Sequence, residues 1–197
     1  MKYALISDIH ANLNALRAVL EDIKAQKCSH TACLGDIVGY GAQPKECLDI
    51  IRGMNIPCVK GNHDEYCSSR IPLEGFNERA AEHVQWTRDR LTDEDRQWLR
   101  HLPYVKQVAG FTLVHSSLDL PHKWGYIFDR LAASSHFVHQ ETAVCFFGHT
   151  HVPLTFVFDT VFRGGTFSTL KVEPGRKYLI NAGSVGQIAT VKETHVM

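Results

Sequence analysis

The N-terminal segment Met1-Lys-Tyr-Ala-Leu-Ile-Ser-Asp-Ile-His10 predicts both a fold class and a site. Residues Tyr3 to Ile6 form a short apolar run rich in β-formers, which is typical of a strand buried on both faces. Asp8 and His10 follow this run, two residues apart. In extended chain this spacing places both side chains on one side, so they can bind a single cation. The alternative is a capping aspartate and an incidental surface histidine before a helix.

The composition indicates one globular domain spanning residues 1–197. Hydrophobic residues make up 44% and charged residues 21%, which are ordinary proportions. The formal net charge is zero, so no global field attracts a nucleic-acid backbone or an anionic membrane. No run approaches the roughly 20 apolar residues of a membrane span, and no signal-type segment is recognisable. We therefore expect a cytoplasmic protein that binds neither long nucleic acid nor membranes.

The cysteines also favour a reducing compartment. They are scattered, never in a C-x-x-C pattern, and several lie inside apolar runs, as buried reduced thiols do. This distribution argues against a disulfide framework and against a zinc ribbon. The six are Cys28, Cys33, Cys47, Cys58, Cys67 and Cys145.

Strands, polar loops and helices alternate in the first third of the chain. Short strands are predicted at His30–Leu34 and Pro57–Lys60, and amphipathic helices at Asn12–Lys27 and about Pro44–Met54. Such alternation predicts a largely parallel sheet, whose ligands gather beyond the carboxyl ends of the strands. We therefore expect the polar groups that follow these strands to meet in space. They are Asp8-x-His10, Gly35-Asp36 and Gly61-Asn62-His63-Asp64.

The stretch from about residue 67 to residue 110 is predicted to be a helical insert beside the site. Asn77 is a candidate cap for a helix running to about Arg90. Thr92 followed by Asp95 resembles a capping box for a second helix, which ends before Pro103.

A second group of strands is predicted after this insert. One strand begins at Phe111 and has His115 at its end, and an apolar strand at Ala143–Phe147 leads into Gly148-His149-Thr150-His151. A short helix is expected between them, from Asp129 to Gln140. Antiparallel strands should follow at Thr155–Phe158, Gly165–Leu170 and Arg176–Ile180, with turns at Arg163-Gly164-Gly165 and Glu173-Pro174-Gly175.

Five polar groups thus follow predicted strands, and their order resembles the calcineurin-like metallophosphoesterase superfamily over about residues 1 to 186. The segments Gly35-Asp36-Ile-Val-Gly-Tyr-Gly41 and Asn181-Ala-Gly-Ser-Val-Gly186 are most similar to its small single-domain bacterial and archaeal phosphoesterases. The resemblance implies an α/β sandwich of two mixed β-sheets flanked by α-helices. It places the site at the carboxyl ends of the first-sheet strands.

The resemblance also implies a dinuclear metal site. Two divalent cations close together need a shared carboxylate to screen their repulsion, a role that falls to Asp36. Mixed imidazole and oxygen ligands suit Mn, Fe, Co, Ni or Zn, of which Mn is favoured. The implied ligands are Asp8, His10 and His151 for one ion, and Asn62, His115 and His149 for the other.

The implied reaction is hydrolysis of a phosphate ester by in-line attack of a hydroxide that bridges two metals. His63 is placed to protonate the leaving alkoxide, and Asp64 to orient His63. We expect a phosphodiesterase acting on small or nucleotide-type substrates, with a phosphomonoesterase as the alternative. A non-catalytic metal-binding interaction scaffold is the alternative from another class; in a scaffold of this fold the catalytic histidine is replaced, whereas His63 is present here.

Two departures from the family pattern narrow these expectations. Protein phosphatases of the superfamily carry an arginine shortly after the second aspartate, whereas this chain has Gly39-Tyr40-Gly41, so a phosphoprotein substrate is not expected. The small enzymes usually continue Gly-Ser-Val-Gly-Gln with Pro-Arg-Asp and another strand, where this chain has Ile188-Ala189-Thr190. The closing edge of the second sheet is therefore expected to be shortened, and the oligomeric state is left open.

The loop from Ser116 to Phe128 is expected to form a wall of the site, because it follows His115 directly. It mixes aromatic and basic side chains. Trp124 is the residue that would stack on a base or aryl group of the substrate. The alternative is that these aromatic residues only pack the loop onto the helical insert.

Overall fold

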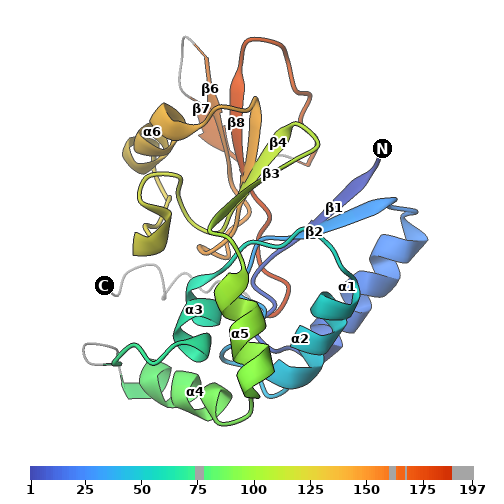
Figure 1. Ribbon diagram of the computed structural model, residues 1–197. Helices are drawn as coiled ribbons and strands as arrows, with labels where there is room; N and C mark the ends of the chain where they lie inside the picture. Colours follow the sequence, from blue (N-terminus) through green and yellow to red (C-terminus); the bar gives the residue numbers. More distant parts are fainter. Residues whose placement is uncertain (74–77, 160–162, 167, 188–197) are drawn as a thin grey trace.

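Two β-sheets with helices on their outer faces make up the part of the chain that the structure, a computed structural model, describes: residues 1–73, 78–159, 163–166 and 168–187 (Figure 1). The first sheet pairs β1 (Tyr3–Ile6) with β2 (His30–Cys33) in parallel. The second is mixed, in the order β3-β4-β5-β8-β6-β7. Its strands are β3 (Val105–Val108), β4 (Phe111–Val114), β5 (Val144–Phe147), β6 (Thr155–Phe158), β7 (Arg163–Gly165) and β8 (Lys177–Asn181).

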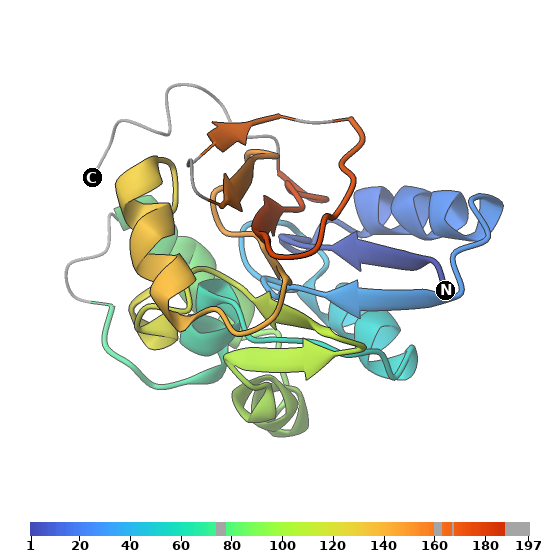
Figure 2. The same cartoon turned by 90° about the horizontal axis from the view of Figure 1, so that it is seen from above.

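Helices lie on opposite sides of the strands. In Figure 2, α1 and α6 lie at opposite sides of the molecule with strands between them. Helices α3, α4 and α5 pack on one another, and α6 contacts β6 and β8. The expected α/β class is therefore confirmed. The helices are α1 (Leu13–Ala25), α2 (Pro44–Gly53), α3 (Asn62–Ser68), α4 (Glu78–Arg88), α5 (Asp93–His101), α6 (Arg130–His139) and the 3₁₀ turn η1 (Pro121–Lys123).

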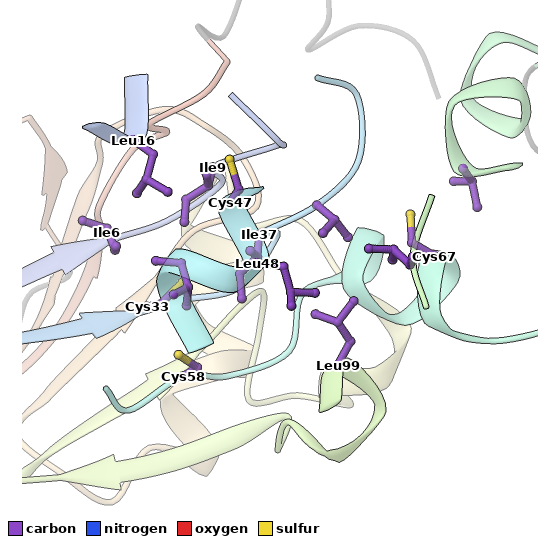
Figure 3. Close-up of a cluster of buried hydrophobic side chains, with 14 residues drawn as sticks. Ile6, Ile9, Leu16, Cys33, Ile37, Cys47, Leu48, Cys58, Cys67 and Leu99 are labelled. Carbon is purple, nitrogen blue, oxygen red and sulfur yellow. The ribbon is translucent and has the colours of Figure 1, made fainter. Parts of the chain in front are cut away.

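Three apolar clusters separate these layers. The first joins β1 and β2 to the helices and is drawn in Figure 3, where Ile6, Leu16 and Leu48 lie close together. The second, around Phe147, joins α6 to the second sheet. The third lies between the sheets and contains Ala32, Leu34, Val59 and Leu113. Burial between layers therefore holds both sheets in place around the site.

The helix ends follow the capping signals in the sequence. The Asn12 side chain accepts from the backbone N–H of Ala15 at 3.1 Å, as an N-cap does. Thr92 and Asp95 form the expected capping box, each side chain accepting from the backbone N–H of the other. The expected cap Asn77 lies outside the described residues, and so does the C-terminal departure that begins at Ile188.

Two elements differ from expectation in the region before β4. Gly61 to Asp64 begins α3 rather than forming a loop, because Asp64 accepts from the backbone N–H of Gly61 at 3.0 Å and so satisfies a free donor at the helix start. The helical insert ends at His101, and β3 follows it. Ala109 and Gly110, both with positive φ (47° and 90°), form the two-residue turn that pairs β3 with β4.

Three further expectations about strands and turns are wrong. The expected strand Pro57–Lys60 makes a single parallel bridge, between Cys58 and Cys33. The turn expected at Arg163–Gly165 is strand β7, whose Gly164 lies opposite Phe156. A β-carbon there would come within 3.1 Å of the Phe156 ring, so the missing side chain lets the strand pair across it. The described residues of the expected strand Gly165–Leu170 form no strand beyond Gly165.

Candidate metal centre

The predicted site residues come together where strands from both sheets end. Asp8 and His10 follow β1, and Asp36 follows β2, as the alternating pattern predicts. His115, however, follows β4, and His149 and His151 follow β5, which are neighbouring strands of the second sheet. The site therefore lies at the carboxyl ends of both sheets, rather than of the first sheet alone as expected.

Asp8, His10 and His151 form one cluster. The Nε2 atoms of His10 and His151 lie 2.9 Å apart, and Nε2 of His151 is 3.2 Å from Oδ1 of Asp8. That carboxylate oxygen is buried and accepts no hydrogen bond from any residue that the structure describes. A buried oxygen with no donor is unfavourable unless a cation completes it, and two imidazole nitrogens converge on the same point. The cluster therefore fits a divalent cation.

A second cluster adjoins the first, and Asp36 lies close to histidines of both. Nε2 of His115 is 3.1 Å from Oδ1 of Asn62 and 3.3 Å from Oδ2 of Asp36. Ligand atoms of Asp36, His115 and His149 all lie within 4.8 Å of one another. The same Oδ2 atom is 3.7 Å from Nε2 of His10 in the first cluster. Asp36 thus lies between the two clusters, where a shared carboxylate would be needed.

Backbone carbonyls fix which nitrogen of two histidines is free to bind a metal. Nδ1 of His115 donates to the carbonyl oxygen of Leu34 at 2.7 Å, and Nε2 of His149 donates to that of Trp124 at 2.9 Å. A carbonyl only accepts, so each of these nitrogens carries a proton, and the other nitrogen of each ring is the one that a metal can bind. This is the arrangement in which metal-binding histidines are held.

The charges of the cluster favour an added cation. Burial lowers the pKa of His10 and of His149 to about 3, so both rings are neutral and able to donate a lone pair. Burial also acts to lower the pKa of His115, but the Asp36 and Asp8 carboxylates outweigh it and raise that pKa to about 9. The buried carboxylates therefore draw a positive charge into the site.

Five of the predicted ligands have left-handed backbone, which is uncommon for residues other than glycine. Such conformations cost on the order of 1–3 kcal/mol each and persist where the surrounding structure enforces them. Strain gathered on residues that share one cluster is typical of a functional site. The residues are Asp8 (φ 54°), His10 (48°), Asp36 (52°), His149 (66°) and His151 (59°).

The segment Ser184 to Gly186 holds the loop that carries Asp8 and His10. The hydroxyl of Ser184 and the backbone N–H of Gly186 both donate to the carbonyl oxygen of Asp8, each at 2.9 Å. A β-carbon at Gly186 would come within 1.8 Å of the Ile9 carbonyl oxygen, so only glycine fits there. The motif that the sequence marked by resemblance therefore supports the strained loop.

His63 lies beside the clusters, but Asp64 does not orient it as expected. His63 is 7% exposed, and its ring is 5.0 Å from that of His10 and 4.3 Å from that of Tyr40. Its Nδ1 atom has no hydrogen-bond partner among the described residues. Asp64 instead accepts from four backbone N–H groups, those of Gly61 and of residues 36 to 38, at 2.8–3.3 Å. Asp64 therefore holds the loop of Asp36, because both its oxygens are already engaged.

Trp124 is a packing residue rather than the substrate-stacking residue expected. It is only 8% exposed, and its indole N–H donates to Glu65 at 3.2 Å. Glu65 also accepts from the hydroxyl of Tyr104. Sequence reasoning missed Glu65, whose only signal was its place one residue after Asp64. Tyr126 and Phe128 of the same loop are exposed, at 40% and 41%.

The fold and the clustered histidines and aspartates define a class of α/β protein with a candidate divalent-metal site at the strand ends. The chain matches the calcineurin-like phosphoesterase superfamily domain over residues 1–197, and it belongs to this family. The family implies divalent metal ions and hydrolysis of phosphate esters. The expected family is therefore confirmed.

Similar proteins support the assignment. A metallophosphoesterase from Sphaerobacter thermophilus is 40% identical, with a TM-score of 0.81 over 95% of this chain and 78% of that one. The protein MJ0912 of Methanocaldococcus jannaschii is 37% identical over 93% of this chain and 76% of its own length. The hypothetical protein PH1004 of Pyrococcus horikoshii, 21% identical, shares the fold, with a TM-score of 0.71 over 93% of this chain and 77% of that one. In the described residues we find no helix long and apolar enough to cross a membrane.

Proposed function

We propose that this protein hydrolyses phosphodiesters at a site that holds two divalent cations, with Mn favoured. The observation that carries the proposal is the place of Asp36, whose Oδ2 atom lies 3.7 Å from His10 in one cluster and 3.3 Å from His115 in the other. Asp8, His10 and His151 would hold one cation, and Asn62, His115 and His149 the other. Such cations supply charge stabilisation of phosphoryl oxygens and a lowered pKa for the attacking water.

His63 is the group that would donate a proton to the leaving alkoxide. Its ring packs against His10, and ligand atoms of His63, His10 and Asp36 all lie within 4.8 Å of one another, so His63 lies at the edge of the first cluster. Burial lowers the pKa of His63 below its usual range, so its ring is neutral in the free protein. An entering phosphate anion favours the protonated imidazole and so prepares the general acid when substrate is present.

The charge of the site supports a diester rather than a monoester. Two divalent cations bring four positive charges, and Asp8, Asp36 and a hydroxide nucleophile set three negative charges against them. In the described part of the chain, the ion pairs of Asp8 and Asp36 are all with histidines, and neither pairs with lysine or arginine. The remaining single positive charge matches the one negative charge of a phosphodiester group. A monoester dianion would need a further cation.

An assay of chelator-treated protein tests the proposal. Protein stripped of metal should lose hydrolysis of bis(p-nitrophenyl) phosphate and regain it when Mn is added. Its kcat/KM for this diester should exceed that for p-nitrophenyl phosphate. Equal activity with and without metal would refute metal dependence. A preference for the monoester would establish a phosphomonoesterase instead, and bound metal without turnover of either ester would favour an interaction scaffold.

A further inference from the structure

The segment from Tyr126 to Phe128 presents two aromatic rings on one side of the chain. Tyr126 and Phe128 are 40% and 41% exposed, whereas Ile127 between them is 1% exposed. This alternation is that of extended backbone, in which residues two apart share a face. The exposed face therefore carries two large rings next to each other.

These rings extend outward from the candidate metal centre. The Tyr126 ring stacks on that of the predicted ligand His149, with centroids 4.0 Å apart and planes 22° apart. The Phe128 ring stacks in turn on Tyr126, with centroids 5.5 Å apart and planes 6° apart. We call these three near-parallel rings the aromatic ladder. One end of the ladder belongs to the site, and the other end is exposed.

The segment that carries the ladder is anchored on its other side. Ile127 packs into the apolar cluster that contains Val114, Phe137 and Phe147. Just before the segment, Trp124 is held by its hydrogen bonds to Glu65 and His149. Rings held in this way lose little freedom when a ligand packs against them, and such preorganisation favours binding.

We propose that Tyr126 and Phe128 bind a flat aromatic ring on the alcohol portion of the substrate. This inference rests on the proposed function, because the phosphate group of the same substrate would be held by the adjacent cations. The chemistry recognised is the ring itself, which an aryl alcohol and a nucleoside share: His149 and Phe128 stack on Tyr126, so the exposed edges of the ladder would pack edge-to-face against any π-face. The ladder therefore takes the role that the sequence assigned to Trp124.

A binding experiment tests the ladder without turnover. Full-length protein loaded with Mn is titrated calorimetrically with phenylphosphonate and with methylphosphonate, whose P–C bonds are not hydrolysed. The wild type should bind the phenyl compound about tenfold more tightly, as one aromatic contact allows. Phe128→Ala should reduce this preference several-fold, since the ring contact of Phe128 is with Tyr126 and not with a predicted ligand. An unchanged preference in Phe128→Ala would overturn the proposal.

Control variants separate stacking from folding. Phe128→Leu keeps apolar bulk without a π-face and should also lose the preference, while Tyr126→Phe keeps both rings and should retain it. Leu131→Ala, at an 80% exposed position on α6, should bind like the wild type. Loss of the phenyl preference in Leu131→Ala, or its retention in Phe128→Leu, would show that the rings do not recognise the ligand.

Kinetics with matched diesters distinguish this inference from the proposed function. Phe128→Ala should raise KM about tenfold for p-nitrophenyl and thymidine esters of phosphate and leave KM unchanged for a methyl diester. A difference between the KM values for the thymidine and the p-nitrophenyl esters would show which kind of ring is preferred. If the wild type hydrolyses every diester and Phe128→Ala changes KM equally for all of them, the role of the ladder is refuted and the proposed function is not. Wild-type protein that hydrolyses no ester but keeps the phenyl preference would refute the proposed function alone.

Discussion

The carbonyl oxygen of Trp124 accepts a hydrogen bond from Nε2 of His149 at 2.9 Å, while the indole N–H of the same tryptophan donates to Glu65 at 3.2 Å. Glu65 lies on α3, three residues after the predicted ligand Asn62. The Glu65 carboxylate thus links α3, which carries Asn62, to Trp124, whose carbonyl oxygen fixes the tautomer of His149. Two ligands from distant parts of the sequence are positioned through a single side chain.

We expect Glu65→Ala to weaken binding of the cation held by the second cluster. The loss should be about 10- to 100-fold, as for other partners that orient a ligand without touching the metal. Competition with a chromophoric chelator measures the affinity. Glu65→Gln should lose less, because an amide oxygen still accepts one bond, and the exposed Glu78→Gln should lose nothing. Unchanged metal affinity accompanied only by a lower Tm would show that Glu65 stabilises the fold alone.

Asp36→Asn should remove both cations. The amide oxygen can still accept from the backbone N–H of His63, a bond of 2.8 Å in the structure, so α3 should stay in place. The neutral side chain cannot screen two cations at once. Elemental analysis after dialysis should therefore show less than one metal per chain, against about two in the wild type. The control is Asp49→Asn, on the exposed face of α2, and metal retained by Asp36→Asn would place the shared ligand elsewhere.

His63→Ala should keep the metals and lower turnover. The expected loss is about 10² to 10⁴ in kcat for an ester with a poor leaving group, the usual effect of removing a general acid. The kcat for esters of acidic phenols should fall much less, because their phenolate anions leave without a proton. Rates measured against leaving-group pKa separate this role from a structural one. Metal loss in His63→Ala would instead make His63 a ligand.

Acid should destabilise the protein through His136. This ring is fully buried on α6, its Nδ1 accepts from the backbone N–H of Leu118 at 3.1 Å, and burial lowers its pKa to about 3. The unfolded chain, with a pKa of about 6.5, binds a proton that the folded chain excludes, so stability falls as pH drops from about 6.5 toward 3.

Urea unfolding of the metal-free protein at pH 7 and pH 5.5 measures this effect. Between these pH values, the free energy of unfolding of His136→Asn should fall by on the order of 1 kcal/mol less than that of the wild type, because the amide oxygen accepts from Leu118 without titrating. The comparison isolates His136 from His10 and His149, which are present in both proteins. An identical pH dependence in the two proteins would contradict the prediction.

The strands and helices that depend on local pattern could be predicted from the sequence. Apolar runs such as Tyr3–Ile6 and capping residues such as Asn12 and Thr92 act within a few residues, and the structure confirms them. The strand-end position of Asp8 and Asp36 follows from the same local logic. Their convergence follows from the rule that ligands gather at the carboxyl ends of parallel strands.

Contacts between distant segments could not be predicted in this way. The bond from Trp124 to Glu65 joins residues 59 positions apart, and nothing in either neighbourhood indicates the other. Asp64 was assigned to His63 because the two are adjacent in sequence, yet the first turn of α3 directs its carboxylate to the backbone around Asp36. Strand β3 was missed because its pairing depends on the positive φ of Ala109, a residue that rarely adopts it.

The hydrogen bond from Ser184 to the Asp8 carbonyl also bears on the order of events during synthesis. It joins residues 176 positions apart, and the contact between His10 and His151 spans 141 positions. Contacts of such long sequence separation form late, because the intervening chain must first be ordered. On the ribosome, β1, β2 and their helices would pack long before the last ligands emerge. Cations held by His149 or His151 would therefore reach their full set of ligands only after these residues emerge, and would then stabilise the folded state by binding to it.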